Sequence, residues 1–153
     1  MPHVMTKSDC NQEPYIFPQG LAGFASAHKF GFIYEGTGDL VCMQSFDQVE
    51  ASFILTAWDE KRLGLPPHVS QEQLHCLEMS RQQLEAGDEM MWMLVLNPFA
   101  DKAWVTANVR APILLNMLKR RGIQCIQRDT SLPLRYHWMK HPAAPVLATA
   151  NAL

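Results

Sequence analysis

The sequence is poor in charge and lacks the local signatures of the common enzyme classes. Charged residues make up 18% of its 153 residues, and the formal net charge of −2 lacks the basic surplus typical of nucleic-acid-binding proteins. We interpret the one basic cluster, 119–121, as a solvent-facing strand end. A Gly-x-Ser-x-Gly nucleophile motif, a phosphate-binding loop and a dinucleotide-binding fingerprint are all absent. No apolar run approaches the roughly 18 residues that a membrane-spanning helix needs.

Cysteine is scarce and scattered. The chain has Cys10, Cys42, Cys76 and Cys125, and no two of them form a C-x-x-C pair. The N-terminal stretch also lacks the features of a signal peptide. This pattern favours free thiols in a reducing, cytoplasmic location. We expect Cys42 and Cys125, which lie inside apolar runs, to be small core residues.

The histidines offer no clear metal site. His137 and His141 have the i, i+4 spacing of a helix, but they lie at the end of a predicted strand and next to Pro142. His75 and Cys76 are adjacent, so on a helix their side chains point in different directions. We therefore predict that the protein binds no metal and no organic cofactor.

Short apolar segments separated by turn residues dominate the chain. They are rich in β-branched and aromatic residues, as is typical of strands. We predict a single domain over 13–138, between flexible tails at 1–12 and 139–153. The second and third strands are expected to form a hairpin with a long loop. The predicted strands are 15–17, 28–34, 40–46, 52–58, 90–96, 104–105, 113–115, 123–127 and 134–138.

One segment carries a strong helix signal. Ser70 and Gln73 have the spacing of a capping box, in which each side chain bonds the other residue's backbone N–H. Apolar residues then recur near one face, and Gly87 suits a helix C-terminal cap. We predict one helix from about Gln71 to Ala86.

The segment 105–116 places a polar break between two apolar runs. Pro112 cannot donate a backbone hydrogen bond, so it suits a strand start, an edge or a bulge. Asn108 and Asn116 bracket the break, and their short amide side chains can stabilise a bend. We predict a strand that kinks and continues, and we favour this structural role over a catalytic asparagine because no nucleophile or base stands nearby in sequence.

Many short strands with one clear helix predict a mainly β fold. The expected form is a compact antiparallel β-barrel-like or sandwich domain with one or two short helices. The acidic pairs 59–60 and 88–89 are typical of solvent-facing surfaces, although carboxylates distant in sequence could still form an acid–base site. The residues alone therefore favour a binding protein. A small β-barrel enzyme and a β-barrel sensor of a small ligand stay open as alternatives.

Several of these segments resemble a known family in the same order along the chain. The run Asn-Val-Arg-Ala-Pro-Ile-Leu-Leu-Asn, from Asn108 to Asn116, is similar to the Asn-Leu-x-Ala-Pro-Ile-x-x-Asn signature of the bacterial flagellar assembly factor FliW. Ala22 and Val109 depart from the family pattern, which has Pro and Leu at these positions. The other similar segments are 20–24 (Gly-Leu-Pro-Gly-Phe in the family), 43–45 (Leu-Gln-Ser), 52–55 and 122–127.

The resemblance implies a non-enzymatic regulatory binding protein with a compact β-barrel-like fold. FliW proteins bind flagellin and also CsrA, a small dimeric RNA-binding repressor, so that secretion of flagellin frees the factor to take up the repressor. A member of this family is expected to bind neither nucleic acid nor membrane. The partner contacts are expected near the polar break, and each residue could instead only stabilise a turn: Gln44, Ser45, Asn108, Arg110 and Asn116.

Overall fold

A computed structural model describes residues 13–34 and 39–141 of the chain. Three short helices lie within these ranges: α2 (Glu60–Leu63), α3 (Gln71–Leu77) and α4 (Arg81–Ala86). The strands are β1 (Tyr15–Ile16), β2 (Lys29–Tyr34), β3 (Val41–Ser45), β4 (Ser52–Ala57), β5 (Met90–Asn97), β6 (Trp104–Ala107), β7 (Ile113–Asn116), β8 (Arg121–Gln124) and β9 (Tyr136–Lys140).

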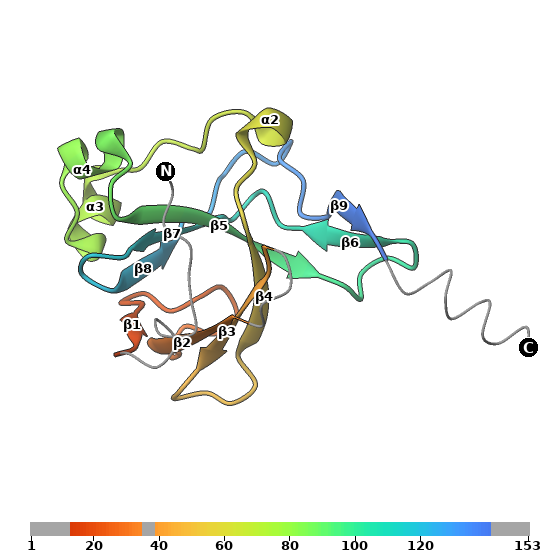
Figure 1. Cartoon of the computed structure of the whole chain (residues 1–153), viewed down its shortest axis with the longest axis horizontal. Coiled ribbons are helices and arrows are strands. Elements are labelled where there is room, and N and C mark those ends of the chain that lie inside the picture. Colours follow the sequence, from red (N-terminus) through yellow and green to blue (C-terminus); the bar gives the residue numbers. More distant parts are fainter. Residues whose placement is uncertain (1–12, 35–38, 142–153) are drawn as a thin grey trace, which may run out of the picture.

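Seven of the strands close into a barrel. Their order is β4-β3-β2-β1-β8-β7-β5, and pairing of β5 with β4 completes the ring. The pairs are antiparallel except for β1 with β8, which run parallel through Ile16 and Arg121. β6 and β9 continue the sheet beyond β5, and Figure 1 shows them as a two-stranded ribbon that extends away from the barrel. We call this ribbon the arm. The predicted mainly β, barrel-like fold is confirmed.

The strand alternation fills the barrel interior. Phe30 and Phe32 of β2 point inward and are buried, whereas Gly31 and Ile33 face outward, as the sequence predicts. The predicted hairpin of β2 and β3 is also present. Aromatic rings meet edge-to-face across this core, with the Phe17 and Phe30 centroids 5.0 Å apart.

The predicted kinked strand runs along one edge of β5. β7 pairs with the first half of β5, and β6 pairs with its last two residues on the same edge. Between them, the Asn108 amide donates to the Val95 carbonyl, and the Pro112 carbonyl accepts from the Cys125 amide. The break therefore passes the chain from the barrel wall into the arm.

Two outer faces of the sheet are covered. α3 and α4 lie over β5, β7 and β8, where Val69, Leu74 and Leu77 pack with Leu114 and Ile123. The outer face of the last half of β5 carries a separate cluster with β6, to which α2 and β9 add partly buried side chains. α3 and α4 lie at the opposite end of the molecule from the arm, whereas α2 lies between them (Figure 1) and contacts β9 through Arg62.

The prediction of one helix from Gln71 to Ala86 was wrong. The capping box of Ser70 and Gln73 begins α3 as expected, but the helix ends at Leu77 because Glu78 adopts a left-handed conformation with φ 52°. A second N-cap, Ser80, accepts a hydrogen bond from the Gln83 amide and begins α4. Gly87 caps α4 as predicted. A left-handed residue and a second N-cap therefore divide the predicted helix into two.

Two further boundaries differ from prediction. β9 runs to Lys140, so Met139 and Lys140 belong to a strand and not to the predicted C-terminal tail. α2 was not predicted; Asp59 begins it by accepting a hydrogen bond from the Lys61 amide. The described part of the chain thus has three short helices where one or two were expected. Residues 1–12 and the rest of the predicted C-terminal tail, 142–153, lie outside the described residues.

Candidate protein-binding surfaces

The five predicted partner contacts do not form one surface. Gln44 and Ser45 lie on β3, whereas Asn116 lies on β7, and at least two other strands separate them in either direction around the barrel. Asn108 and Arg110 lie in the break that leads to the arm. Each side chain makes hydrogen bonds within the chain, so the structure favours the alternative of fold-stabilising roles.

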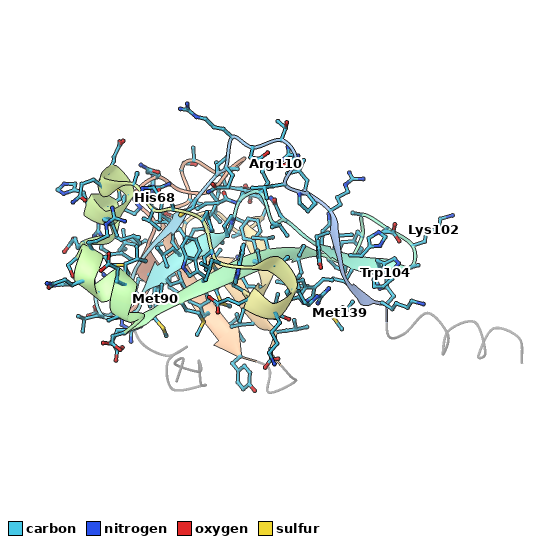
Figure 2. All side chains as sticks on the ribbon, turned by 90° about the horizontal axis from the view of Figure 1, so that it is seen from above. His68, Met90, Lys102, Trp104, Arg110 and Met139 are labelled. Carbon is cyan, nitrogen blue, oxygen red and sulfur yellow. The ribbon has the colours of Figure 1, made fainter. Side chains whose placement is uncertain are left out.

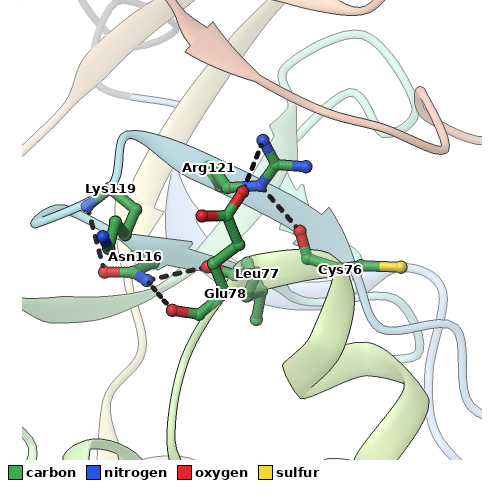
Figure 3. A network of polar contacts seen from close by, with 6 residues as sticks. All are labelled: Cys76, Leu77, Glu78, Asn116, Lys119 and Arg121. Carbon is green, nitrogen blue, oxygen red and sulfur yellow. Dashed lines mark hydrogen bonds and ion pairs between the residues drawn. The ribbon is translucent and has the colours of Figure 1, made fainter.

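Asn116 is the clearest example. Its side chain is fully buried, and its Nδ2 donates to the carbonyls of Leu77 and Glu78 at 2.8 and 3.4 Å. Its Oδ1 accepts from the Lys119 amide at 3.4 Å, as well as from the Leu118 amide. Figure 3 shows this amide between the end of α3 and the turn after β7. Asn116 therefore bonds two carbonyls that, in an unbroken helix, would accept hydrogen bonds from amides of the next turn.

Arg121 supports the same helix end from β8. Its Nε donates to the Cys76 carbonyl at 2.8 Å, and its Nη1 lies 3.2 Å from Oε2 of Glu78 (Figure 3). Favourable charge near a helix C-terminus adds to these bonds. The basic residues of 119–121, expected to mark a solvent-facing strand end, thus include one that fastens α3 to the barrel.

Gln44 and Ser45 organise the turn after β3. The Ser45 hydroxyl donates to Oδ1 of Asp47 at 2.7 Å and accepts from the Gln48 amide at 2.8 Å. Gln44 donates to the carbonyl of Val49 at 3.0 Å from the outer face of the strand. The bond from Ser45 and a second from the His28 amide lower the pKa of Asp47.

Asn108 and Arg110 hold the polar break in place. Oδ1 of Asn108 accepts from the Arg110 amide at 3.1 Å, forming an Asx turn. The Arg110 guanidinium donates to the carbonyls of Thr130 and Leu132, both at 2.9 Å, and so anchors the segment that leads to β9. The bond-forming role predicted for Asn108 is present, although its side chain is only half-buried.

One face of the barrel wall has exposed apolar side chains, and none of the three helices in the described ranges lies over it. Ile33, Cys42 and Ile54 are direct partners on neighbouring strands β2, β3 and β4, so they form a row across the outer face. Ile33 is 47% exposed and Ile54 39%. The ring of Phe46, itself 59% exposed, lies over Gly31, where a Cβ would stand 2.6 Å from the ring. We call Ile33, Cys42, Phe46 and Ile54 the open face.

The open face was not predicted from the sequence, and the position of Cys42 was predicted wrongly. Cys42 was expected in the core, but it faces outward beside the Ser52 hydroxyl, at 3.7 Å. The available signal was the alternation itself, because outward positions of β2 and β4 carry isoleucine where a solvent-facing strand usually carries polar residues. Exposed apolar groups in a row are typical of protein-binding surfaces.

The described residues offer little for catalysis. No group of three or more His, Cys, Asp or Glu side chains within 13–34 and 39–141 could hold a metal ion. Burial raises the pKa of the Cys125 thiol to about 12, so this core cysteine stays protonated at neutral pH. No helix in the described ranges is long and apolar enough to cross a membrane.

Comparison with known proteins decides the family. The family model described as FliW protein matches residues 4–138. The chain belongs to the FliW family. A flagellar assembly factor FliW from Leptospira biflexa is 29% identical over 120 residues, which cover 78% of this chain and 76% of that protein. The FliW of Caldicellulosiruptor bescii is 27% identical over 135 residues, covering 88% and 86%.

The fold agrees with this assignment. A crystal structure of the flagellar assembly factor FliW superposes with a TM-score of 0.67 and 22% identity, covering 87% of each chain. One of the segments that resemble FliW forms a tight turn of the backbone. In the segment 20–24, Gly20 has φ 66°, and a Cβ there would stand 2.6 Å from the Phe24 carbonyl. This turn buries Leu21 and packs Phe24 against the barrel core, as predicted.

Proposed function

We propose that this FliW-family chain is a non-enzymatic partner-switching protein that binds flagellin and a CsrA-type translational repressor in the cytoplasm. Its relatives are named flagellar assembly factors, which supports a role in building the flagellum. In the proposal, flagellin occupies the factor until it is secreted, and the freed factor then takes up the repressor. Flagellin synthesis is thereby coupled to assembly.

The observation that carries this proposal is the open face on a closed barrel. β3 pairs with β2 and with β4 along the row that Ile33, Cys42 and Ile54 form, so their exposed apolar surface is covered by a segment that packs onto the outer face and not by a strand that adds to an edge. A protein partner that covered Ile33 and Ile54 would remove their apolar surface from water, which contributes about 25 cal/mol per Å² before the costs of association.

The open face is also our proposed partner contact. Among the five residues expected from the resemblance, Gln44 lies on the outer side of β3 beside it, while Ser45 faces the interior. Asp47 and Glu50, both exposed, follow in the adjoining turn and add negative charge. An acidic rim suits a basic RNA-binding repressor, because opposite charges raise association rates and suppress wrong partners.

Partner switching then follows from mass action. A factor bound to flagellin is unavailable to the repressor, so the free concentration of the factor reports the amount of unsecreted flagellin. No conformational change is required for this coupling. The two partners need only exclude each other from the factor.

The experiment is a gel-shift titration of the repressor bound to flagellin messenger RNA. The factor should release free RNA when it exceeds the repressor, and added flagellin should reverse the release. RNA alone, mixed with the factor, serves as the control and should not shift. Two results would contradict the partner-switch proposal. One is a gel shift of RNA by the factor alone, and the other is that no RNA is released from the repressor when the factor is in excess.

Two double variants test where the partners bind. Ile33→Ser with Ile54→Ser removes the open face, whereas Leu118→Ser with Ile126→Ser removes two other exposed apolar side chains, 64% and 59% exposed. We expect the first pair to weaken flagellin or repressor binding at least tenfold and the second to leave both unchanged. Equal affinities for the two variants would reject the open face while leaving the switch itself intact.

A further inference from the structure

The arm presents a second surface. It carries cationic and aromatic side chains, whereas the open face is apolar and has acidic residues beside it. Trp104 pairs directly with Lys140, and Thr106 with His137, so these four side chains point to one side of the β6–β9 ribbon. A register shift between Val105 and Thr106 places Trp138 out of the regular alternation. The bulge brings the imidazole and the ammonium group to the same side as Trp104.

Aromatic and cationic groups are in contact on this side. The rings of Trp104 and His137 stack with centroids 4.7 Å apart and planes 11° from parallel. Lys140 Nζ lies 5.7 Å from the Trp104 ring centroid, within cation–π range. His137 and Lys140 are exposed, whereas Trp104 is half-buried. Trp104 is thus held in place while one side of the cluster stays open to solvent.

The turn before β6 adds to this cluster. Figure 2 shows Lys102 and Trp104 together at the end of the arm. Lys102 is exposed, and Phe99 in the same turn is 93% exposed. We call Lys102, Trp104, His137 and Lys140 the arm face.

The carboxylate of Asp101, in the turn before β6, accepts hydrogen bonds from that turn. Oδ1 of Asp101 accepts from the amides of Ala103 and Trp104 at 2.8 and 3.0 Å. The first of these bonds is the main cause that lowers the pKa of Asp101, and the nearby charges of His137 and His141 lower it further. Asp101 therefore acts as an acceptor within the turn, and no ion pair to Lys102 or Lys140 is present among the described residues.

We propose that the arm face binds an acidic segment of a protein partner. The lysine ammonium groups of Lys102 and Lys140 receive its carboxylates, and the Trp104 ring receives a neighbouring aromatic or aliphatic side chain. Charge complementarity selects this occupant, because the arm face is cationic on a chain whose net charge is −2. This inference does not depend on the proposed partner switch.

A protein segment fits better than a nucleic acid. Single-stranded nucleic acids are bound through an extended basic groove that follows many phosphates, together with several stacking rings. The arm face has two lysines, which are too few to follow many phosphates. A short acidic segment needs only two carboxylate contacts and one apolar contact.

The experiment uses a fluorescein-labelled peptide, Asp-Glu-Tyr-Glu-Asp-Glu, and the full chain in an anisotropy titration at low salt. We expect saturable binding that weakens as salt is added and no binding of the matched amide peptide, Asn-Gln-Tyr-Gln-Asn-Gln. The double variant Lys102→Glu with Lys140→Glu should raise the Kd for the acidic peptide at least tenfold.

A matched double variant removes the effect of net charge. Lys29→Glu with Lys119→Glu changes the total charge equally at two exposed lysines on β2 and in the β7–β8 turn. This variant should keep the wild-type Kd within about twofold, and thermal melts should be equal for both variants. Equal losses in the two variants, no binding by the wild-type chain, or tighter binding of an oligouridylate would each overturn the proposal.

Discussion

Aromatic side chains are held differently in the barrel and in the arm. In the barrel, Phe17 and Phe30 are fully buried and contact each other edge-to-face. In the arm, Tyr136 and Trp138 are only half-buried, and the guanidinium of Arg62 covers them at 5.2 and 4.1 Å from the ring centroids. A closed sheet encloses its rings, whereas a two-stranded ribbon depends on neighbouring side chains.

The difference follows from strand number. A two-stranded ribbon has too little apolar area to be stable alone, so the arm relies on α2 and on the outer face of β5. Arg62 also donates to the carbonyl of His137 at 2.9 Å, which occupies a hydrogen-bonding group of β9, the last strand of the sheet. This contact protects a sheet edge that could otherwise pair with another chain.

The largest effect is expected in the barrel core. Phe17→Ala should lower the free energy of unfolding by about 3–5 kcal/mol, because it removes a fully buried ring and leaves a cavity. Denaturant unfolding measures the change. Phe99→Ala, at a side chain 93% exposed in the turn before β6, is the control and should change stability little. Similar losses for both would contradict the contrast between barrel and arm.

The second effect compares the two ends of the kinked segment. Asn116→Ala should cost about 2–3 kcal/mol, because it leaves the buried Leu77 carbonyl without its hydrogen bond. Asn108→Ala removes one bond from a half-buried amide and should cost about 0.5–1.5 kcal/mol. Thermal melts of the two variants show which one loses more stability. If Asn108→Ala left the melt unchanged and abolished partner binding, its structural role would be wrong.

A smaller effect is expected at the junction of α2 and the arm. Arg62→Ala should reduce stability by about 1 kcal/mol, since it removes an exposed cation–π contact and one hydrogen bond. Amide hydrogen exchange should become faster in β9 and stay unchanged in β2 and β3. Lys61→Ala, at the exposed neighbour of Arg62, is the matched control. Uniform acceleration across the barrel would show that the arm is not a separate unit.

The smallest effect is the loss of the stabilisation by Asp47 at low pH. The pKa of Asp47 lies below its ordinary value of 3.8, mainly because Ser45 donates to it, so ionised Asp47 stabilises the folded state above that pH. This contribution is lost as the pH falls through the lowered pKa. Melts of wild type and Asp47→Asn should therefore differ at pH 7, and the difference should shrink as the pH falls below 3.8. A difference that stays constant over this range would exclude the charge of Asp47 as the cause.

Local patterns predicted much of the fold. The alternation of Phe30 and Phe32 fixed the inward face of β2, and the spacing of Ser70 and Gln73 fixed the start of α3. The run from Asn108 to Asn116 predicted a kinked strand, which the pairing of β5 with both β6 and β7 confirms. These features depend on residues near one another in sequence, so local sequence was sufficient.

The candidate surfaces were much less predictable. The five residues expected to contact partners are dispersed around the barrel, and the open face arises because Ile33, Cys42 and Ile54 come from three strands in one register. The arm face likewise needs the β6–β9 pairing and its bulge. Neither set is adjacent in sequence, so the alternation within a strand could indicate an outward isoleucine but not which strands bring such residues together.

The sequence by itself determined the strand periods, the turns that need glycine or asparagine, and the helix caps, because each depends on backbone and side-chain preferences within a few residues. Tertiary structure decided where the helical pattern breaks. The segment 71–86 is helical on both sides of Glu78, and the buried amide of Asn116, distant in sequence, takes the carbonyls of Leu77 and Glu78 at the end of α3. The break leaves these two carbonyls free to bond an amide that would otherwise be buried without partners.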